Sequence, residues 1–189
     1  MRKILFIICW ALAGVGLYSC SLDEPSYGKT TSDNYYQKES DIEQALTGAY
    51  LQLRTTWNEY ALNHYFVGDC STDDALKGGG NDGDRAEVRD LSDFTIYTTN
   101  GEVGRRWEIL YRLINRCNDV IYYAPDAIGN EELLKRYANE AKALRAFGYY
   151  CLVTTFGEVP LITTPMQPAE ILQIPRSPLE KVYECIVND

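Results

Sequence analysis

The sequence is poor in histidine and in clustered basic residues, and these shortages exclude several classes of protein. His64 is the only histidine among the 189 residues, so we expect neither a histidine-rich metal site nor a histidine-activated nucleophile. No basic run is longer than two residues, as in the pair Arg105–Arg106, and the net charge is −9, so we expect no nucleic acid as a partner. Apolar residues make up 46% of the chain, which favours a packed core over a disordered chain.

The N-terminus carries a short apolar run that predicts export. Residues 4–17 are fourteen uncharged residues that follow Arg2 and Lys3. As a helix this run would span about 21 Å, short of the ~30 Å hydrocarbon core of a bilayer, which is typical of a secretory signal. The run ends in the segment Leu17-Tyr18-Ser19-Cys20, which resembles a bacterial lipobox.

The lipobox resemblance implies that residues 1–19 are a lipoprotein signal peptide and that Cys20 becomes the acylated N-terminus of the mature chain. Residues 20–38 would then be an acylated tether carrying chains such as palmitate, because two or more acyl chains hold a protein stably on a membrane. The alternatives are an ordinary cleaved signal with a chance cysteine at this position, and an uncleaved anchor.

The remaining cysteines show no Cys-x-x-Cys pair that would indicate a zinc site. Cys9 would leave with the signal peptide, so that four cysteines stay available: Cys70, Cys117, Cys151 and Cys185. Export makes disulfide bonds chemically possible. Three of the four fall in helical stretches, however, so we predict that they pack as small hydrophobic residues.

Residues 39–189 are predicted to form a helical domain, because apolar residues recur there at helical spacing. The first helix is expected to open at a capping box, with Ser40 as the cap and Glu43 reaching back, and to run to Trp57. The last helix is expected to open at a second capping box, residues 177–180. Its apolar stripe reaches Asp189 without a cap or a partner, so we interpret the domain as truncated at its C-terminus.

Two longer helices and one long loop are predicted between these ends. The helices span about residues 104–123 and from near Asn130 to the residue before Gly157, where glycine suits a helix C-terminus. Residues 68–100 have no helical period, and their glycine, asparagine and aspartate residues are typical of turns. We therefore predict a long exposed loop there, and such loops are often functional.

Three blocks of sequence carry a family resemblance. They are Trp107, Tyr111, Ile114 and Asn118; EAKALRAFGYY at 140–150 with FGEVPL at 156–161; and Arg176-Ser177, Val182-Tyr183, Ile186 and Asp189. Together they resemble the SusD/RagB family of outer-membrane nutrient-binding lipoproteins. Gly148 departs from the family pattern, in which a larger residue is usual, and it is expected to loosen the packing of its helix.

The resemblance implies an all-α fold of tetratricopeptide-like helix pairs with long irregular loops. It also implies a surface-exposed lipoprotein, anchored by its lipid in the cell outer membrane, that binds oligosaccharides. The protein would deliver them to a TonB-dependent outer-membrane transporter of the SusC-like type, and it would need no cofactor. Arg145 and Glu140 would form ion pairs or hydrogen bonds to loops, and Trp107 and Tyr111 would belong to the core.

Candidate ligand residues lie in the predicted loop, because sugars combine apolar faces with polar rims that suit aromatic and charged partners. The candidates are Asp69, Asp73, Asp74, Arg85 and Arg89. The alternative is that these residues belong only to a solvated, charged loop.

Three other functions are weighed against nutrient binding. A glycoside hydrolase would need two carboxylates roughly 5–9.5 Å apart, and the sequence shows no apolar surroundings that would raise the pKa of one of them. A calcium site is unsupported, because Gly78 and Gly80 occupy ligand positions when Gly83 is placed at the turn of an EF-hand loop. A helical-repeat scaffold for proteins stays open, since such repeats commonly bind peptides.

Overall fold

The computed structural model describes residues 32–54, 60–81 and 83–189. The predicted signal peptide at residues 1–19, Cys20 and Trp57 therefore lie outside the described residues. Within them the secondary structure is helical, with two isolated β-bridges, which confirms the all-α prediction. The α-helices are α2 (Ser32–Tyr35), α3 (Glu39–Tyr50), α4 (Tyr60–Gly68), α5 (Ala86–Ser92), α6 (Gly101–Tyr123), α7 (Glu131–Phe156), α8 (Pro168–Ile171) and α9 (Leu179–Asn188), with short 3-10 turns η1 (Leu51–Leu53), η2 (Asp69–Ser71) and η3 (Ala124–Asp126).

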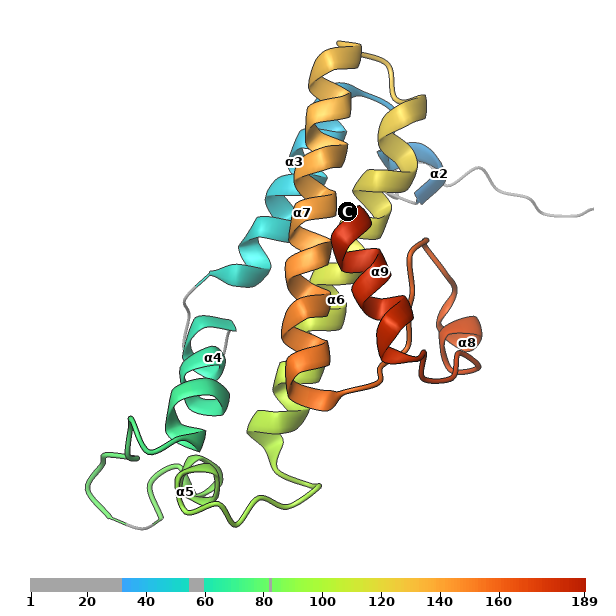
Figure 1. Ribbon diagram of the computed structural model, residues 1–189. Coiled ribbons are helices and arrows are strands. Elements are labelled where there is room, and N and C mark those ends of the chain that lie inside the picture. Colours follow the sequence, from blue (N-terminus) through green and yellow to red (C-terminus); the bar gives the residue numbers. More distant parts are fainter. Residues whose placement is uncertain (1–31, 55–59, 82) are drawn as a thin grey trace, which may run out of the picture. The chain divides into compact units, whose positions relative to one another are not determined.

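The antiparallel pair of α6 and α7 forms the centre of the described fold, and α3 packs against both (Figure 1). Each long helix begins at an asparagine whose side chain caps it. Asn100 Oδ1 accepts hydrogen bonds from the amides of residues 102 and 103, and Asn130 Oδ1 accepts from those of residues 132 and 133. These caps satisfy amides that have no partner inside the helix. The predicted span of α7 is confirmed, with Gly157 at φ 71° after its last residue.

Two groups of buried side chains fill the helix interfaces. The first joins α3 to one end of the α6–α7 pair and includes Ile42, Leu46, Leu113, Val120 and Leu144. The second joins the other end of the pair to α9 and includes Leu110, Tyr149, Leu152, Val159 and Val182. The neighbouring helices thus bury apolar side chains of α6 on two sides.

Gly148 of α7 packs directly against α6. A Cβ atom at this position would come within 3.0 Å of Ile114 Cγ1 and 3.5 Å of Leu113 Cδ2. The glycine is itself buried. The expectation that Gly148 loosens the packing was wrong, because the absence of a side chain lets the two helices approach.

The start of α3 differs from the predicted capping box. The helix begins at Glu39 with Lys38 as the N-cap residue, and the Lys38 amide donates to Asp41 Oδ2 at 2.9 Å. The prediction that Ser40 caps the helix and Glu43 reaches back was wrong, since Asp41, two residues before Glu43, provides the acceptor. Residues 32–38 also belong to the helical unit, which begins at Ser32 and so ahead of residue 39.

The predicted long loop contributes to a third group of buried side chains. Residues 69–71 form η2, residues 86–92 form α5, and both contact α4. Cys70, Val88 and Leu91 are buried together with Phe66 of α4. The prediction of one exposed loop over residues 68–100 was therefore wrong in part, because its few apolar residues meet in space.

The last helix docks on α7 and is held by an ion pair. Val182 is fully buried, so the apolar stripe of α9 has a partner that the sequence did not reveal. Pro178 is the N-cap residue and no side chain caps the helix, so the predicted capping box at residues 177–180 was wrong. Arg145 of α7 donates to both carboxylate oxygens of Asp189, each at 2.6 Å, and also to Asn118 Oδ1.

Candidate functional site

The five predicted ligand residues lie in one lobe built from α4, η2 and α5. Asp69 opens η2, and Asp73 and Asp74 follow it on an exposed bend. Arg85 precedes α5 and Arg89 lies within it, half-buried. The structure therefore brings the segments that carry these residues around a shared apolar centre.

Arg85 is engaged in contacts within the protein. Its backbone adopts the left-handed conformation at φ 46°. Its guanidinium lies 4.8 Å from the centre of the Phe66 ring and its Nη1 lies 3.6 Å from Glu102 Oε1. A cation over an aromatic face and beside a carboxylate is stabilised by both. Arg85 thus ties the start of α5 to α4 and α6.

Glu102 is a nearly buried carboxylate at the junction of α4, α5 and α6. Asn63 Nδ2 donates to the Glu102 backbone oxygen at 2.7 Å and to its Oε2 at 3.2 Å. Arg105 Nε lies 3.9 Å from Oε2. Two arginines and one amide therefore share this carboxylate, which keeps a buried negative charge compensated.

His64 forms a second polar contact between α4 and α6. Arg106 Nη1 lies 3.2 Å from His64 Nδ1, and Arg106 Nε donates to Thr155 Oγ1 at 2.9 Å. Arginine can only donate, so Nδ1 accepts and the imidazole is neutral in this arrangement. Burial and the Arg106 charge lower the pKa of His64, and the nearby Asp69 carboxylate opposes that shift.

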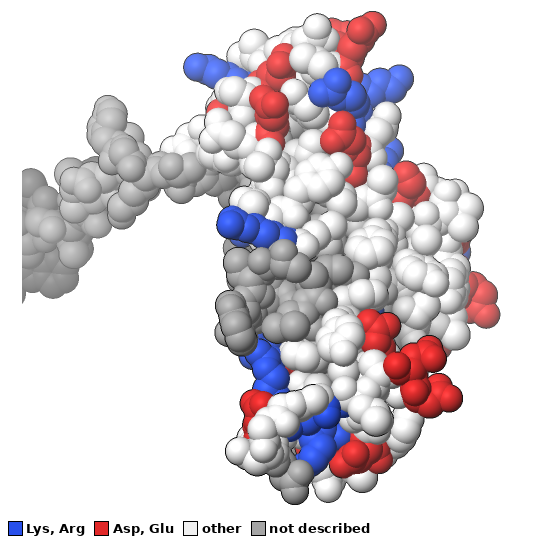
Figure 2. Space-filling view, turned by 90° about the vertical axis from the view of Figure 1, so that its left-hand side faces the viewer, with Lys and Arg blue, Asp and Glu red and all other residues white. Residues whose placement is uncertain are grey.

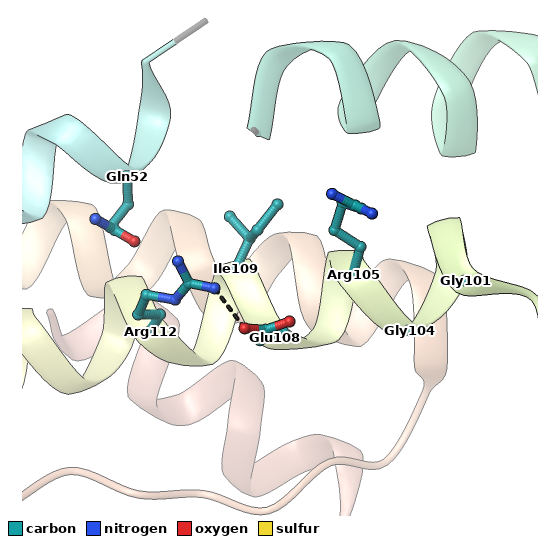
Figure 3. Close-up of a pocket in the computed structure, with 7 residues that line it drawn as sticks. All are labelled: Gln52, Gly101, Gly104, Arg105, Glu108, Ile109 and Arg112. Carbon is teal, nitrogen blue, oxygen red and sulfur yellow. Dashed lines mark hydrogen bonds and ion pairs between the residues drawn. The ribbon is translucent and has the colours of Figure 1, made fainter. Parts of the chain in front are cut away.

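A polar cavity of about 490 Å³ lies along the adjoining face of α6. It is lined by Gln52, Gly101, Gly104, Arg105, Glu108, Ile109 and Arg112. Figure 3 shows Gln52, the middle residue of η1, reaching toward α6, opposite the side chains that rise from α6. Arg112 Nη2 is paired with Glu108 Oε1 one helical turn away. This volume is in the range of small-molecule sites.

A second cavity of about 360 Å³ is mainly apolar and lies on another face of α6. Trp107 and Tyr111 line it with Ile162 and the end of α8. Their ring centres are 4.8 Å apart, and the Tyr111 hydroxyl donates to the Pro160 oxygen at 2.7 Å. The two residues were predicted to be core, and they pack against the second core group while bordering this cavity.

Charges of both signs lie on the face formed by α3, α4 and α5. Figure 2 shows blue and red side chains together at the upper end of this face and a mainly red group at its lower right. Such a surface does not favour a single polyanionic or polycationic partner, and recognition depends on local groups.

The family of the chain is decided by its match over residues 21–189. That segment matches the SusD-like family described as starch-binding and associating with the outer membrane. The chain belongs to this SusD-like family.

Curated SusD-like relatives align with nearly the whole chain. SusD-like protein P2 of Formosa agariphila is 30% identical over 192 residues, covering 99% of this chain and 36% of that protein. SusD-like protein P25 of the same organism is 25% identical over 199 residues, covering 99% of this chain and 37% of that protein. The chain thus spans about a third of the length of these relatives.

Solved SusD-like structures share the helical arrangement. A laminarin-binding SusD-like protein aligns with a TM-score of 0.72 and 30% identity, over 81% of this chain and 33% of that chain. Surface glycan-binding protein A from Bacteroides fluxus aligns with a TM-score of 0.68 and 28% identity, over 80% of this chain and 32% of that chain. These matches confirm the SusD-like fold.

The residues that sequence reasoning missed in this SusD-like chain are those of the polar cavity. Gly101, Arg105, Glu108 and Arg112 recur at three- and four-residue spacing, which places them on one face of a helix. That stripe was readable as an amphipathic pattern. The cavity itself was not, because Gln52 reaches it from a distant part of the sequence.

The described residues contain no group of three or more His, Cys, Asp or Glu side chains that could hold a metal ion. None of the helices in the described ranges is long and apolar enough to cross a membrane. Within the described residues, Cys70, Cys117, Cys151 and Cys185 form no disulfide bond. Burial raises the pKa of the Cys117 thiol to about 12, so this residue packs as a small hydrophobic group and is not a thiolate nucleophile.

Proposed function

We propose that the whole protein binds glycans at the cell surface and delivers them to a TonB-dependent outer-membrane transporter of the SusC-like type. The observation that carries this proposal is the family match over residues 21–189. It is supported by the likeness to a laminarin-binding SusD-like protein at 30% identity and a TM-score of 0.72. The protein acts by binding and performs no chemical step on the glycan.

The ligand contacts that we propose in the α4–η2–α5 lobe are Asp69, Asp73, Asp74 and Arg89. Asp73 and Asp74 are exposed, so their carboxylates can accept hydrogen bonds from sugar hydroxyls. Arg85 is better assigned to holding the lobe together, because it already contacts Glu102 and Phe66.

Affinity electrophoresis of the full-length protein against a panel of polysaccharides tests the binding function. We expect retardation by at least one glycan, and reduced retardation for an Asp73→Ala, Asp74→Ala double variant. The matched control is Glu131→Ala, which removes an exposed acidic side chain from the first turn of α7. If no glycan of the panel retards the protein, the binding function is contradicted. Release of reducing sugar from a glycan would point to a hydrolase.

Pull-down of the intact protein from outer membranes tests the delivery step. We expect a TonB-dependent barrel to co-purify in amounts comparable to the bait. Recovery of other proteins without a barrel would favour the scaffold function.

A further inference from the structure

We propose that the polar cavity on α6 binds a sugar unit that carries an anionic group, a carboxylate or a sulfate. The inference rests on the proposed glycan-binding function and names the class of glycan. The groups that recognise the anion are the guanidinium groups of Arg105 and Arg112, which line the same cavity of about 490 Å³.

The spacing of the two arginines places their side chains on the same face of α6, beside one cavity. They are seven residues apart on α6, which is about two helical turns and roughly 10 Å along the axis, so they lie on the same face. Arginine presents planar pairs of N–H donors that match the oxygens of a carboxylate or a sulfate. A sugar ring between them can offer its anionic group to one arginine and its hydroxyls to the other.

The floor of the cavity is open at Gly104, whereas the Glu87 carboxylate fills the space beside Gly101. A Cβ atom at Gly104 would have no other heavy atom within 4 Å, so the space above it is free. At Gly101 a Cβ atom would come within 2.7 Å of Glu87 Oε1, which accepts a hydrogen bond from the Gly101 amide. Ile109 supplies an apolar surface between the arginines, and apolar contact suits the faces of a sugar ring.

The charges around the cavity leave room for an added anion. Arg112 is paired only with the exposed Glu108 among the described residues, and their side chains are 49% and 68% exposed. Such surface pairs contribute little to stability, so a ligand carboxylate or sulfate can compete for the guanidinium.

Arg105 is held at the other end of the same cavity. Its Nε lies 3.9 Å from Glu102 Oε2, and Glu102 is also paired with Arg85. Arg85, Arg105 and Arg112 thus face Glu87, Glu102 and Glu108 in this region, so the charges balance. A ligand anion would bind here by replacing Glu108 beside Arg112.

Isothermal titration of the full-length protein with matched oligosaccharides tests the proposal. One arm compares an oligouronate with its carboxyl-reduced counterpart, and the other compares a sulfated oligosaccharide with its desulfated counterpart. The variants are Arg112→Gln and Arg105→Gln, and the control is Arg136→Gln on α7, which removes an exposed arginine paired with Glu140. Arg112→Gln keeps the test valid if Arg105→Gln destabilises the fold.

We expect the native protein to bind the anionic member of one pair about tenfold more tightly than its neutral counterpart, the effect of one charge-assisted hydrogen bond. Arg112→Gln should abolish that preference and Arg136→Gln should preserve it. The arm that shows the preference identifies the group as carboxylate or sulfate. Equal affinities within both pairs, or a preference unchanged in Arg112→Gln and Arg105→Gln, overturn the inference while glycan binding itself persists. Loss of binding to every glycan instead contradicts the proposed function.

Discussion

At residue 148 the chain has no side chain, and the two longest helices meet there. A Cβ atom at Gly148 would lie 3.0 Å from the buried Ile114, whereas Gly104 on the open face of α6 has free space around it. Both residues lie inside helices, where alanine is favoured over glycine by up to about 1 kcal/mol. Alanine substitutions at the two positions therefore have the same effect through helix propensity and different effects through packing.

We predict opposite effects of the same substitution at these positions. Gly104→Ala should raise the free energy of unfolding by about 0.5–1 kcal/mol through helix propensity. Gly148→Ala should lower it by about 1 kcal/mol, because the cost of overpacking exceeds the same gain. Urea unfolding of both variants measures the difference, and equal stabilisation by the two would contradict the close contact of α6 and α7.

The single histidine predicts a pH dependence with a definite sign. The pKa of His64 is lowered from its ordinary 6.5 in the folded protein by burial and by Arg106. Below pH 6.5 the unfolded chain therefore binds more protons at this residue, and folding loses stability as the pH falls through that value. Above pH 6.5 the contribution of His64 to the free energy of unfolding is fully present.

The measurement is the unfolding free energy of the native protein and of His64→Asn between pH 8 and pH 5. We expect the native protein to lose more stability than the variant as the pH falls. In parallel, Arg106→Gln should raise the pKa of His64 in an NMR titration, because the neighbouring positive charge is removed. A pKa for His64 above 6.5 in the native protein would show that its nitrogen does not accept from Arg106.

Among the elements, α9 shows how a helix docks through one face. Val182 is fully buried against α7, whereas Val187 on the same helix is 82% exposed. The ion pair of Arg145 with Asp189 closes the far end of this contact. Docking thus depends on a narrow stripe of α9.

We predict that Val182→Ala lowers the free energy of unfolding by about 2 kcal/mol, because it removes buried methyl groups and leaves a cavity. Val187→Ala should change it by less than about 0.5 kcal/mol. Hydrogen exchange at the amides of α9 should accelerate only in the Val182 variant. Equal protection in the two variants would contradict the docked position of α9.

At the scale of the whole molecule, we predict that the protein is attached to the membrane through acyl chains on Cys20. Cys20→Ala should abolish palmitate labelling and release the protein from the membrane fraction, because the acyl chains supply the attachment. Cys9→Ala is the matched control, since that cysteine would leave with the signal peptide, and it should stay labelled and membrane-bound. An unlabelled native protein would exclude lipidation.

The sequence by itself determined the presence of the two long helices and both ends of α7. Asn130 and Gly157 bound α7 as predicted, because capping and helical periodicity are local properties of neighbouring residues. Local signals were less decisive at Ser40 and Ser177, where other residues took the cap position. A short capping motif allows the helix to begin at more than one neighbouring residue.

Only the tertiary structure decided which residues share a surface. The apolar centre of Phe66, Cys70, Val88 and Leu91 joins segments that each look irregular alone, and the polar cavity needs Gln52 beside α6. Arg85 changed from a candidate ligand residue to a structural contact because Glu102 lies next to it. Such groupings depend on contacts between residues far apart in the chain, which periodicity and local motifs do not encode.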